Sequence, residues 1–117
     1  MNIEDLRAYC LSKPYVSEHL PFDEHTLVFK IGELKVFALA SLKEANAVNL
    51  KCDPDYAVSL REDFFGISPG YHMNKKHWNT ITFNEDVNDK KIKHLINHSY
   101  ELVYKKLTKK QKLQFPI

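Results

Sequence analysis

The sequence predicts a two-layer α+β fold, in which an antiparallel sheet of about five strands carries helices packed on one face. Two features predict this class. Short β-rich segments follow one another between helical segments, and the turns that join the segments are short. Consecutive strands with short connections favour antiparallel pairing, with the helices collected on one side of the sheet. A length of 117 residues suits one domain of ordinary size, so we expect residues 1–117 to form a single domain.

Capping residues and apolar periodicity predict four helices. Asn2, Asp53 and Asn88 are each followed by a segment with apolar residues at helical spacing, and a side chain of this type accepts hydrogen bonds from the first free N–H groups of a helix. The helix after Asn88 is expected to be the longest. Thr108 with Gln111 three residues later resembles a capping box, which predicts a last short helix.

The predicted strands are rich in β-branched and aromatic residues and lie between turn signals. They span residues 16–22, 26–31, 34–40, 47–52 and 78–83. Gly32 and Glu33 are expected to form a two-residue hairpin turn in which Ile31 faces Leu34. On that register the core side of the hairpin carries Leu27, Phe29, Ile31, Leu34, Val36 and Ala38. The opposite side carries Lys30 and Lys35 together with Val28, Phe37 and Leu39.

The segment 47–52 alternates in a way typical of a half-buried strand. Val48, Leu50 and Cys52 are expected to point toward the core, while Asn49 and Lys51 point away from it. Cys10 and Cys52 are the only cysteines, and no CxxC spacing occurs, so both are interpreted as reduced core residues.

Composition excludes several classes of protein. No stretch approaches the ~18 consecutive apolar residues of a membrane span, and the acidic N-terminus is unlike a signal peptide, so we expect a cytoplasmic location and no membrane partner. Residues 1–50 carry 5 basic and 7 acidic side chains, whereas residues 51–117 carry 12 basic and 8 acidic ones. This asymmetry favours an anionic partner for the C-terminal half.

One basic, aromatic-flanked loop and strand is the candidate binding surface. Lysines supply charge for phosphates, amides bond base edges or backbone oxygens, and a tryptophan can stack on a base. The predicted nucleic-acid or anion-binding residues are Asn49, Lys51, His72, Asn74, Lys75, Lys76, His77, Trp78 and Asn79. The alternative interpretation is that the tryptophan belongs to the core and the paired lysines are merely solvated. The lysine run between Lys105 and Lys112 is interpreted as a solvated helix face.

Catalysis and metal binding are less well supported. The acidic pairs sit at predicted helix ends and turns, where capping explains them, and no nucleophile elbow, phosphate loop or dinucleotide fingerprint occurs. His94 and His98 are four residues apart on one helix, a spacing that can hold a transition metal, but no third ligand is specified. We therefore expect no enzymatic activity, no metal site and no cofactor.

Three motifs in combination resemble the MmcQ/YjbR family of small bacterial proteins. They are NLKCDP at residues 49–54, PGYHMNKKHWN at 69–79 and INHSYELV at 96–103, and the resemblance extends from Met1 to about Lys110. It implies an α+β fold of the CyaY-like type. Members are described as DNA-binding proteins by similarity to a double-wing motif, and the family lends no substrate, cofactor or reaction.

The residues and the resemblance together predict a non-enzymatic binding module, monomeric, with DNA as its partner. A small anionic ligand or a protein partner at the same surface is the alternative.

Overall fold

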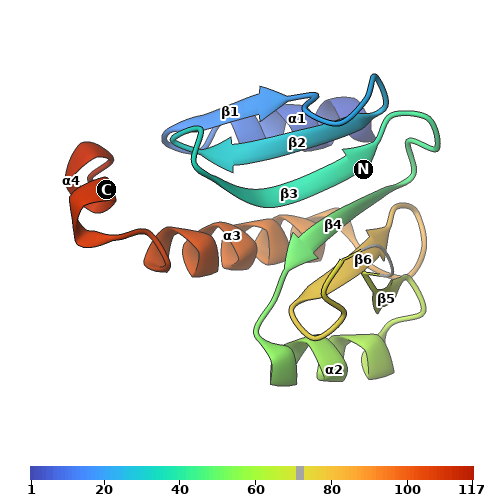
Figure 1. Cartoon of the computed structure of the whole chain (residues 1–117). Coiled ribbons are helices and arrows are strands. Elements are labelled where there is room, and N and C mark those ends of the chain that lie inside the picture. Colours follow the sequence, from blue (N-terminus) through green and yellow to red (C-terminus); the bar gives the residue numbers. More distant parts are fainter. Residues whose placement is uncertain (71–72) are drawn as a thin grey trace.

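A computed structural model describes residues 1–70 and 73–117 of the chain (Figure 1). The elements in chain order are α1 (Ile3–Leu11), β1 (Val16–His19), β2 (Thr26–Ile31), β3 (Lys35–Ser41), β4 (Ala47–Lys51), α2 (Pro54–Asp63), β5 (Ile67–Pro69), β6 (Trp78–Thr82), α3 (Asp89–Lys105) and α4 (Lys109–Gln114). The predicted α+β class is confirmed.

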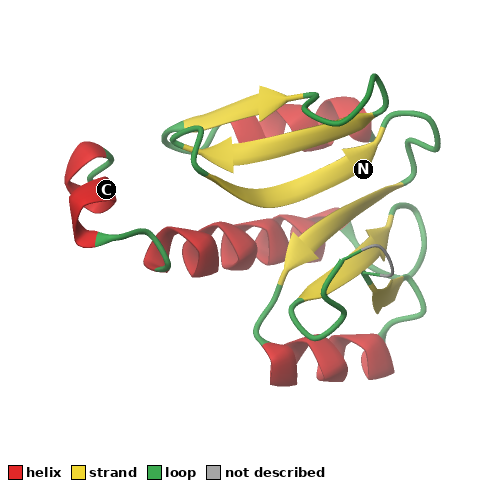
Figure 2. Ribbon diagram, viewed as in Figure 1, coloured by secondary structure: helices red, strands yellow, loops and turns green. Residues whose placement is uncertain are grey.

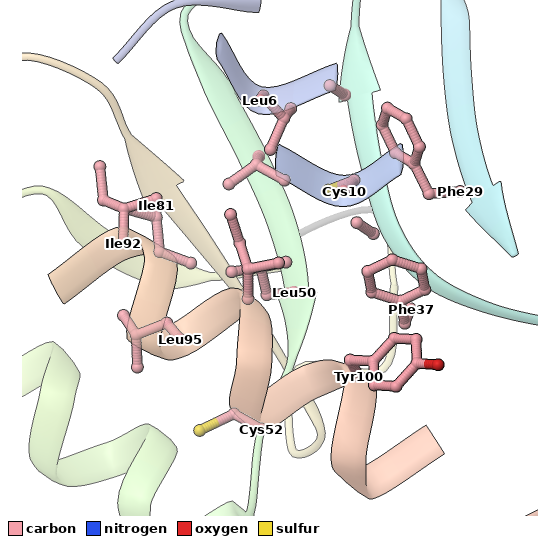
Figure 3. Packing of buried hydrophobic residues seen from close by; sticks show 14 of the residues in the cluster. Leu6, Cys10, Phe29, Phe37, Leu50, Cys52, Ile81, Ile92, Leu95 and Tyr100 are labelled. Atoms are coloured by element: carbon pink, nitrogen blue, oxygen red, sulfur yellow. The ribbon is translucent and has the colours of Figure 1, made fainter. Parts of the chain in front are cut away.

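The sheet is antiparallel throughout and has six strands in the order β1-β2-β3-β4-β6-β5 (Figure 2). The strand that the sequence did not predict is β5, a three-residue edge strand beside β6. Residues of α1, α2 and α3 join the inward residues of the strands in one buried cluster. Figure 3 shows the part of this cluster that α1 and α3 form with the strands. All three helices therefore cover the same face. None of them covers the other face, which we call the open face, although Val28 on that face is completely buried.

The predicted helix starts are confirmed. The side chains of Asn2, Asp53 and Asn88 each accept a hydrogen bond from a backbone N–H of the first helical turn. Thr108 and Gln111 form the expected capping box, with each side chain bonded to the backbone of the other residue.

The register of the β2–β3 hairpin differs from the prediction. Ile31 pairs with Lys35 instead of Leu34, and a register shift follows between Phe29 and Lys30. Leu34 is 43% exposed in the turn, whereas Phe37 is completely buried. Val36 pairs with Lys30, and Lys35 pairs with the buried Ile31, so the predicted faces of Leu34, Lys35, Val36 and Phe37 were wrong. The shift matches a β-bulge, which opposes two residues of one strand to one residue of the other and so reverses the alternation. Periodicity in the sequence does not reveal it.

Strands β3 and β4 pair only at Ala38↔Leu50 and Leu39↔Asn49 and then diverge, which Figure 1 shows beside α3. Ser99 of α3 bridges the two strands where they part. Its hydroxyl donates to the Phe37 carbonyl at 2.6 Å and accepts from the Lys51 N–H at 2.9 Å. A buried side chain thus replaces a ladder hydrogen bond and holds the divergent strand ends in place.

Replacing Ser99 with alanine is expected to lower the free energy of unfolding by about 1–3 kcal/mol for each backbone group that loses its partner, because both groups lie beside the core. Equilibrium urea unfolding measures this. Ser59→Ala, at an exposed serine of α2, is the matched control and should change the midpoint little. Equal effects of the two substitutions would contradict the bridging role.

Both cysteines are free and buried, as predicted. Burial raises the pKa of Cys10 to about 12 and that of Cys52 to about 11. Since the thiolate is the reactive form, neither side chain is poised for nucleophilic or metal chemistry at neutral pH.

Candidate nucleic-acid interface

The open face of the sheet displays polar side chains from adjacent strands. The predicted alternation of β4 is confirmed: Val48 and Leu50 are buried, and Asn49 and Lys51 lie on the opposite side. The β4–β6 register places Asn49 opposite Thr80 and Lys51 opposite Trp78. Opposite residues in an antiparallel pair share a face, so Lys51 and Trp78 are direct neighbours on the open face.

Hydrogen-bond donors dominate this pair of strands. The Asn49 side-chain oxygen is occupied, because it accepts from the Thr80 hydroxyl at 2.6 Å, and this leaves the Asn49 amide N–H groups for other acceptors. The Trp78 indole N–H makes no hydrogen bond in the described part of the chain, and it is not among buried atoms without a partner. It is therefore accessible to solvent, on the residue that pairs with Lys51 across the two strands.

Two further lysines approach Lys51 from other elements. Burial first, and then the positive charges of Lys106 and Lys35, lower the pKa of Lys51. Lys35 starts β3, Lys51 ends β4 and Lys106 follows α3, so three elements bring these charges within electrostatic range of one another where β3 and β4 diverge. Lys35 pairs with the buried Ile31, so Lys35 and Lys106 lie toward the helix side of the sheet at this point. Within residues 1–70 and 73–117, none of the three makes an ion pair with a carboxylate. We call Lys35, Lys51 and Lys106 the lysine cluster.

Within the lysine cluster, the side chain of Lys35 reaches the backbone of Lys106. The Lys35 ammonium group lies 3.5 Å from the Lys106 carbonyl oxygen, at the C-terminus of α3. A cation there is favoured by the helix dipole, which offsets part of the repulsion among the lysines.

The loop before β6 is a compact turn built around Asn74. Its carbonyl accepts from the N–H groups of His77 and Trp78, and its side-chain oxygen accepts from the Lys76 N–H at 3.0 Å. The guanidinium of Arg61 on α2 donates to the Lys75 carbonyl at 3.2 Å. These bonds hold the loop against α2 and leave the Lys75 and Lys76 side chains exposed.

Comparison with known proteins places the chain in a family. A family model described as YjbR matches residues 11–102. The chain belongs to the YjbR family.

Relatives in this family share most of the chain. Protein YbdF of Escherichia coli O157:H7 is 38% identical over 108 residues, which cover 92% of this chain and 88% of YbdF. YjbR of Escherichia coli K12 is 29% identical over 101 residues, which cover 86% of each protein. Both are named as uncharacterised proteins, so their names bring no ligand or reaction to the site.

Solved structures show the same fold. The crystal structure of a Deinococcus radiodurans protein with a DUF419 domain has a TM-score of 0.89 and 39% sequence identity, covering 96% of this chain and 86% of that one. A crystal structure from Pseudomonas syringae has a TM-score of 0.75 and 29% identity, covering 87% and 98%. The six-stranded open sheet is therefore the YjbR-family architecture.

The predicted site residues of this YjbR-family chain separate into groups. Asn49, Lys51 and Trp78 lie together on the open face, and Asn74 to His77 form the adjoining loop. His72 falls outside the described residues. The backbone carbonyl and the side-chain oxygen of Asn74 both accept hydrogen bonds within the turn, so Asn74 stabilises the shape of the loop.

Asn79 does not lie on the predicted surface. It is only 1% exposed, pairs with Leu50 across the strands, and therefore faces the helices. Its side chain accepts from the Arg61 guanidinium at 2.9 Å and donates to the Ala57 carbonyl at 3.3 Å. Placing Asn79 among the surface residues was wrong, because neighbours on a strand point to opposite faces and Trp78 takes the outward position.

Sequence reasoning missed Lys35 and Lys106 as neighbours of Lys51 at the candidate site. Lys35 was assigned to a hairpin face, and Lys106 belonged to a run interpreted as solvated. The signal available in the sequence was topological, since the start of one strand and the end of its antiparallel neighbour meet at the same end of a sheet.

On α3, His98 of the pair His94 and His98 contacts protein groups, which does not support the hypothesis of a metal site. The His98 Nε2 accepts from the Asp53 N–H at 3.3 Å, and the ring lies edge-on to Tyr56 at a centroid distance of 5.3 Å. Among the described residues, no group of three or more His, Cys, Asp or Glu side chains is arranged to hold a metal ion. Nor does the described chain contain a helix long and apolar enough to cross a bilayer.

His98 makes stability depend on pH. Burial lowers its pKa, as do the nearby His94 and Lys105, while Asp53 and Glu101 act in the opposite direction. The unfolded chain therefore binds this proton more readily. Its contribution is complete above pH about 6.5 and is lost as the pH falls through the lower pKa of the folded state.

We expect the melting temperature of the wild type to fall more steeply between pH 7 and pH 5 than that of His98→Gln. Glutamine can accept from the Asp53 N–H but does not titrate, so the difference between the two curves isolates His98 from the other five histidines. Differential scanning calorimetry across this range checks it. Parallel curves would contradict the assignment.

Proposed function

We propose that this chain is a non-enzymatic module that binds DNA, as a single strand, on the open sheet face. The observation that carries the proposal is the strand pairing that places Lys51 opposite Trp78, whose indole N–H is accessible, with Lys35 and Lys106 near Lys51. No carboxylate of the described chain forms an ion pair with any of these three lysines. Phosphate oxygens accept from donors of this kind. An aromatic ring on an open sheet is a platform on which an unpaired base can stack.

The hollows found among the described residues offer little support for a small anion bound on the open face. One cavity lined in part by Lys51 measures about 10 Å³, room for about one water molecule, and its other lining residues include Leu50, Asn79 and Leu95 on the helix side of the sheet. Larger hollows of about 440 and 540 Å³ lie elsewhere, and their linings include the acidic residues Asp5 with Asp89 and Glu85 with Asp86 respectively. Carboxylates repel anions, so these two hollows are poor sites for the small anionic ligand of the alternative hypothesis. A hollow of about 340 Å³ at the start of α3 has a basic lining of Asn88, Lys90, Lys91 and His94, but neither Lys51 nor Trp78 lines it.

The proposal is testable without a label, because Trp78 is the single tryptophan of the chain. Titrating single-stranded oligonucleotides at low and physiological salt should quench the Trp78 emission, with saturation at the concentration seen by anisotropy of a labelled oligonucleotide. Binding should weaken steeply with salt. Duplex of the same sequence should bind less tightly, since its bases are not available for stacking.

Three outcomes would count against the proposal. An absence of binding at either salt concentration would reject DNA as the ligand. Binding by anisotropy with unchanged Trp78 emission would place the contact elsewhere on the protein. Quenching by inorganic phosphate or mononucleotides at comparable concentrations would instead favour the small-anion alternative at the same surface.

A further inference from the structure

The C-terminal helix α4 is held in place although it contributes nothing to the core. None of its six residues is buried. Leu113 within it is 82% exposed, so hydrophobic burial does not explain why this segment is ordered against the domain. Short isolated helices are marginal in water, and tertiary contacts normally decide whether they form.

The contacts that hold α4 lie just beyond it, around Phe115. The Phe115 ring packs on Tyr15 at a centroid distance of 5.3 Å, and its carbonyl accepts from the Tyr104 hydroxyl at 2.8 Å. The Tyr15 hydroxyl donates to the carbonyl of Pro116 at 2.6 Å. We call this set of contacts the aromatic clasp.

Gly32 completes the aromatic clasp. It has a φ of +58° in the β2–β3 turn, and a Cβ atom there would lie 2.5 Å from the Phe115 ring. The turn therefore needs glycine for two reasons, its backbone conformation and the close approach of the ring. Through this contact α4 is fixed to the same end of the sheet where β3 begins.

That end of the molecule is the basic one. Figure 1 shows α4, the end of α3 and the β2–β3 turn together on one side, away from the β3–β4 and β6–α3 loops. Lys109 and Lys110 are exposed on α4, and Lys105 and Lys106 are exposed just before it. The loops at the other end carry Asp23, Glu24, Glu44, Glu85 and Asp86. Glu33 is the exception in the turn at the basic end, and Lys43 is the exception in the loops at the acidic end. Such a separation of charge orients a polyanion toward the basic end.

Lys112 differs from the other lysines of α4. Its ammonium group lies 6.0 Å from the centroid of the Tyr104 ring, within the range of a cation–π contact, so it belongs to the attachment of the helix. Lys109 and Lys110 have no ion pair or ring contact in the described structure. The helix is attached by aromatic groups and leaves two ammonium groups directed to solvent.

We propose that residues 104–116 form a fixed arm whose lysines, Lys109 and Lys110, bind phosphates of the same single strand that contacts the lysine cluster and Trp78. This proposal rests on the proposed function and adds the course that the bound DNA strand takes over the protein surface. The strand runs from the loop before β6, over Lys51 and Trp78, past Lys35 and Lys106, to α4. Since the arm is fixed, the phosphates meet lysines already in position, which reduces the ordering cost of binding.

The test compares two charge-reversal variants of the whole chain. Lys109→Glu with Lys110→Glu should weaken binding to an oligonucleotide by about tenfold at low salt, and the slope of log K against log salt should fall by about 0.7 for each phosphate that is no longer neutralised. Lys43→Glu with Lys90→Glu is the control. These lysines are exposed outside the basic end, and the substitutions change the net charge by the same amount. The control should keep nearly wild-type affinity and slope.

A second variant tests the arm without removing charge. Phe115→Ala retains every lysine but opens the aromatic clasp, so affinity should fall several-fold while the melting temperature of the domain changes little. An affinity for the Lys109 and Lys110 variant equal to that of the control would overturn the proposed arm, as would wild-type affinity for Phe115→Ala. The proposed function would survive either result. Failure of the wild type to bind any oligonucleotide would overturn both.

Discussion

Replacing Phe37 with alanine is expected to lower the free energy of unfolding by about 3–5 kcal/mol, the range for truncating a buried aromatic side chain. Phe37 has no exposed surface, and its ring meets that of Tyr100 edge-on at a centroid distance of 5.4 Å (Figure 3). The loss combines the transfer free energy of the ring with the cavity left behind. Equilibrium urea unfolding, with the midpoint and slope fitted together, measures it.

Leu34→Ala is the matched control, because simple alternation along the hairpin places Leu34 in the core and Phe37 outside it. With the register shift, Leu34 is 43% exposed in the turn. Its truncation is therefore expected to change the free energy of unfolding by no more than about 0.5 kcal/mol. A larger effect at Leu34 than at Phe37 would show that the hairpin pairs without the shift.

Reversing the charge at the centre of the lysine cluster is expected to have the largest effect on DNA binding. Lys51→Glu should weaken binding of a single-stranded oligonucleotide by about tenfold or more at low salt and reduce the slope of log K against log salt by about 0.7 for each phosphate that is no longer neutralised. Lys51 lies beside Trp78 and close to Lys35 and Lys106. A carboxylate here would attract these lysines and repel the phosphate that they are proposed to bind. Anisotropy at several salt concentrations measures both quantities.

Lys43→Glu makes the same change of net charge in the loop between β3 and β4, at the other end of the sheet. It should leave the affinity close to that of the wild type. Equal losses for the two variants would mean that net charge alone attracts the strand, and that the open face beside Trp78 is not the site. Unchanged melting temperatures would establish that both variants are folded.

Local sequence signals accounted for most of the fold. The caps at Asn2, Asp53 and Asn88 lie where their residue types indicate, since a capping hydrogen bond spans only three residues. The alternation of β4 was equally readable, because both faces of that strand obey it. The hairpin register was not, because the shift is a property of the pairing between β2 and β3 and leaves no signal in the residue types of either strand. The short strand β5 was missed because three residues carry too little pattern.

The candidate site was predictable only in part, because some of its members depend on pairing between strands and not on local sequence. The pattern of β4 and the motif around Trp78 indicated Asn49, Lys51 and Trp78, each from its own stretch of chain. Asn79 could not be separated from Trp78 without the pairing of β6, which turns one outward and the other toward Arg61. Lys35 and Lys106 join the site only through contacts between elements far apart in the sequence.

By itself the sequence determined the α+β class, the helix starts, the buried thiols and the family, because each depends on residue types and spacings within a short window. The tertiary structure alone decided the hairpin register, the parting of β3 and β4 around Ser99, and the meeting of three lysines from three elements. These features depend on pairing between distant segments. Such pairing is selected by the free energy of the whole core, not by any one stretch of the chain.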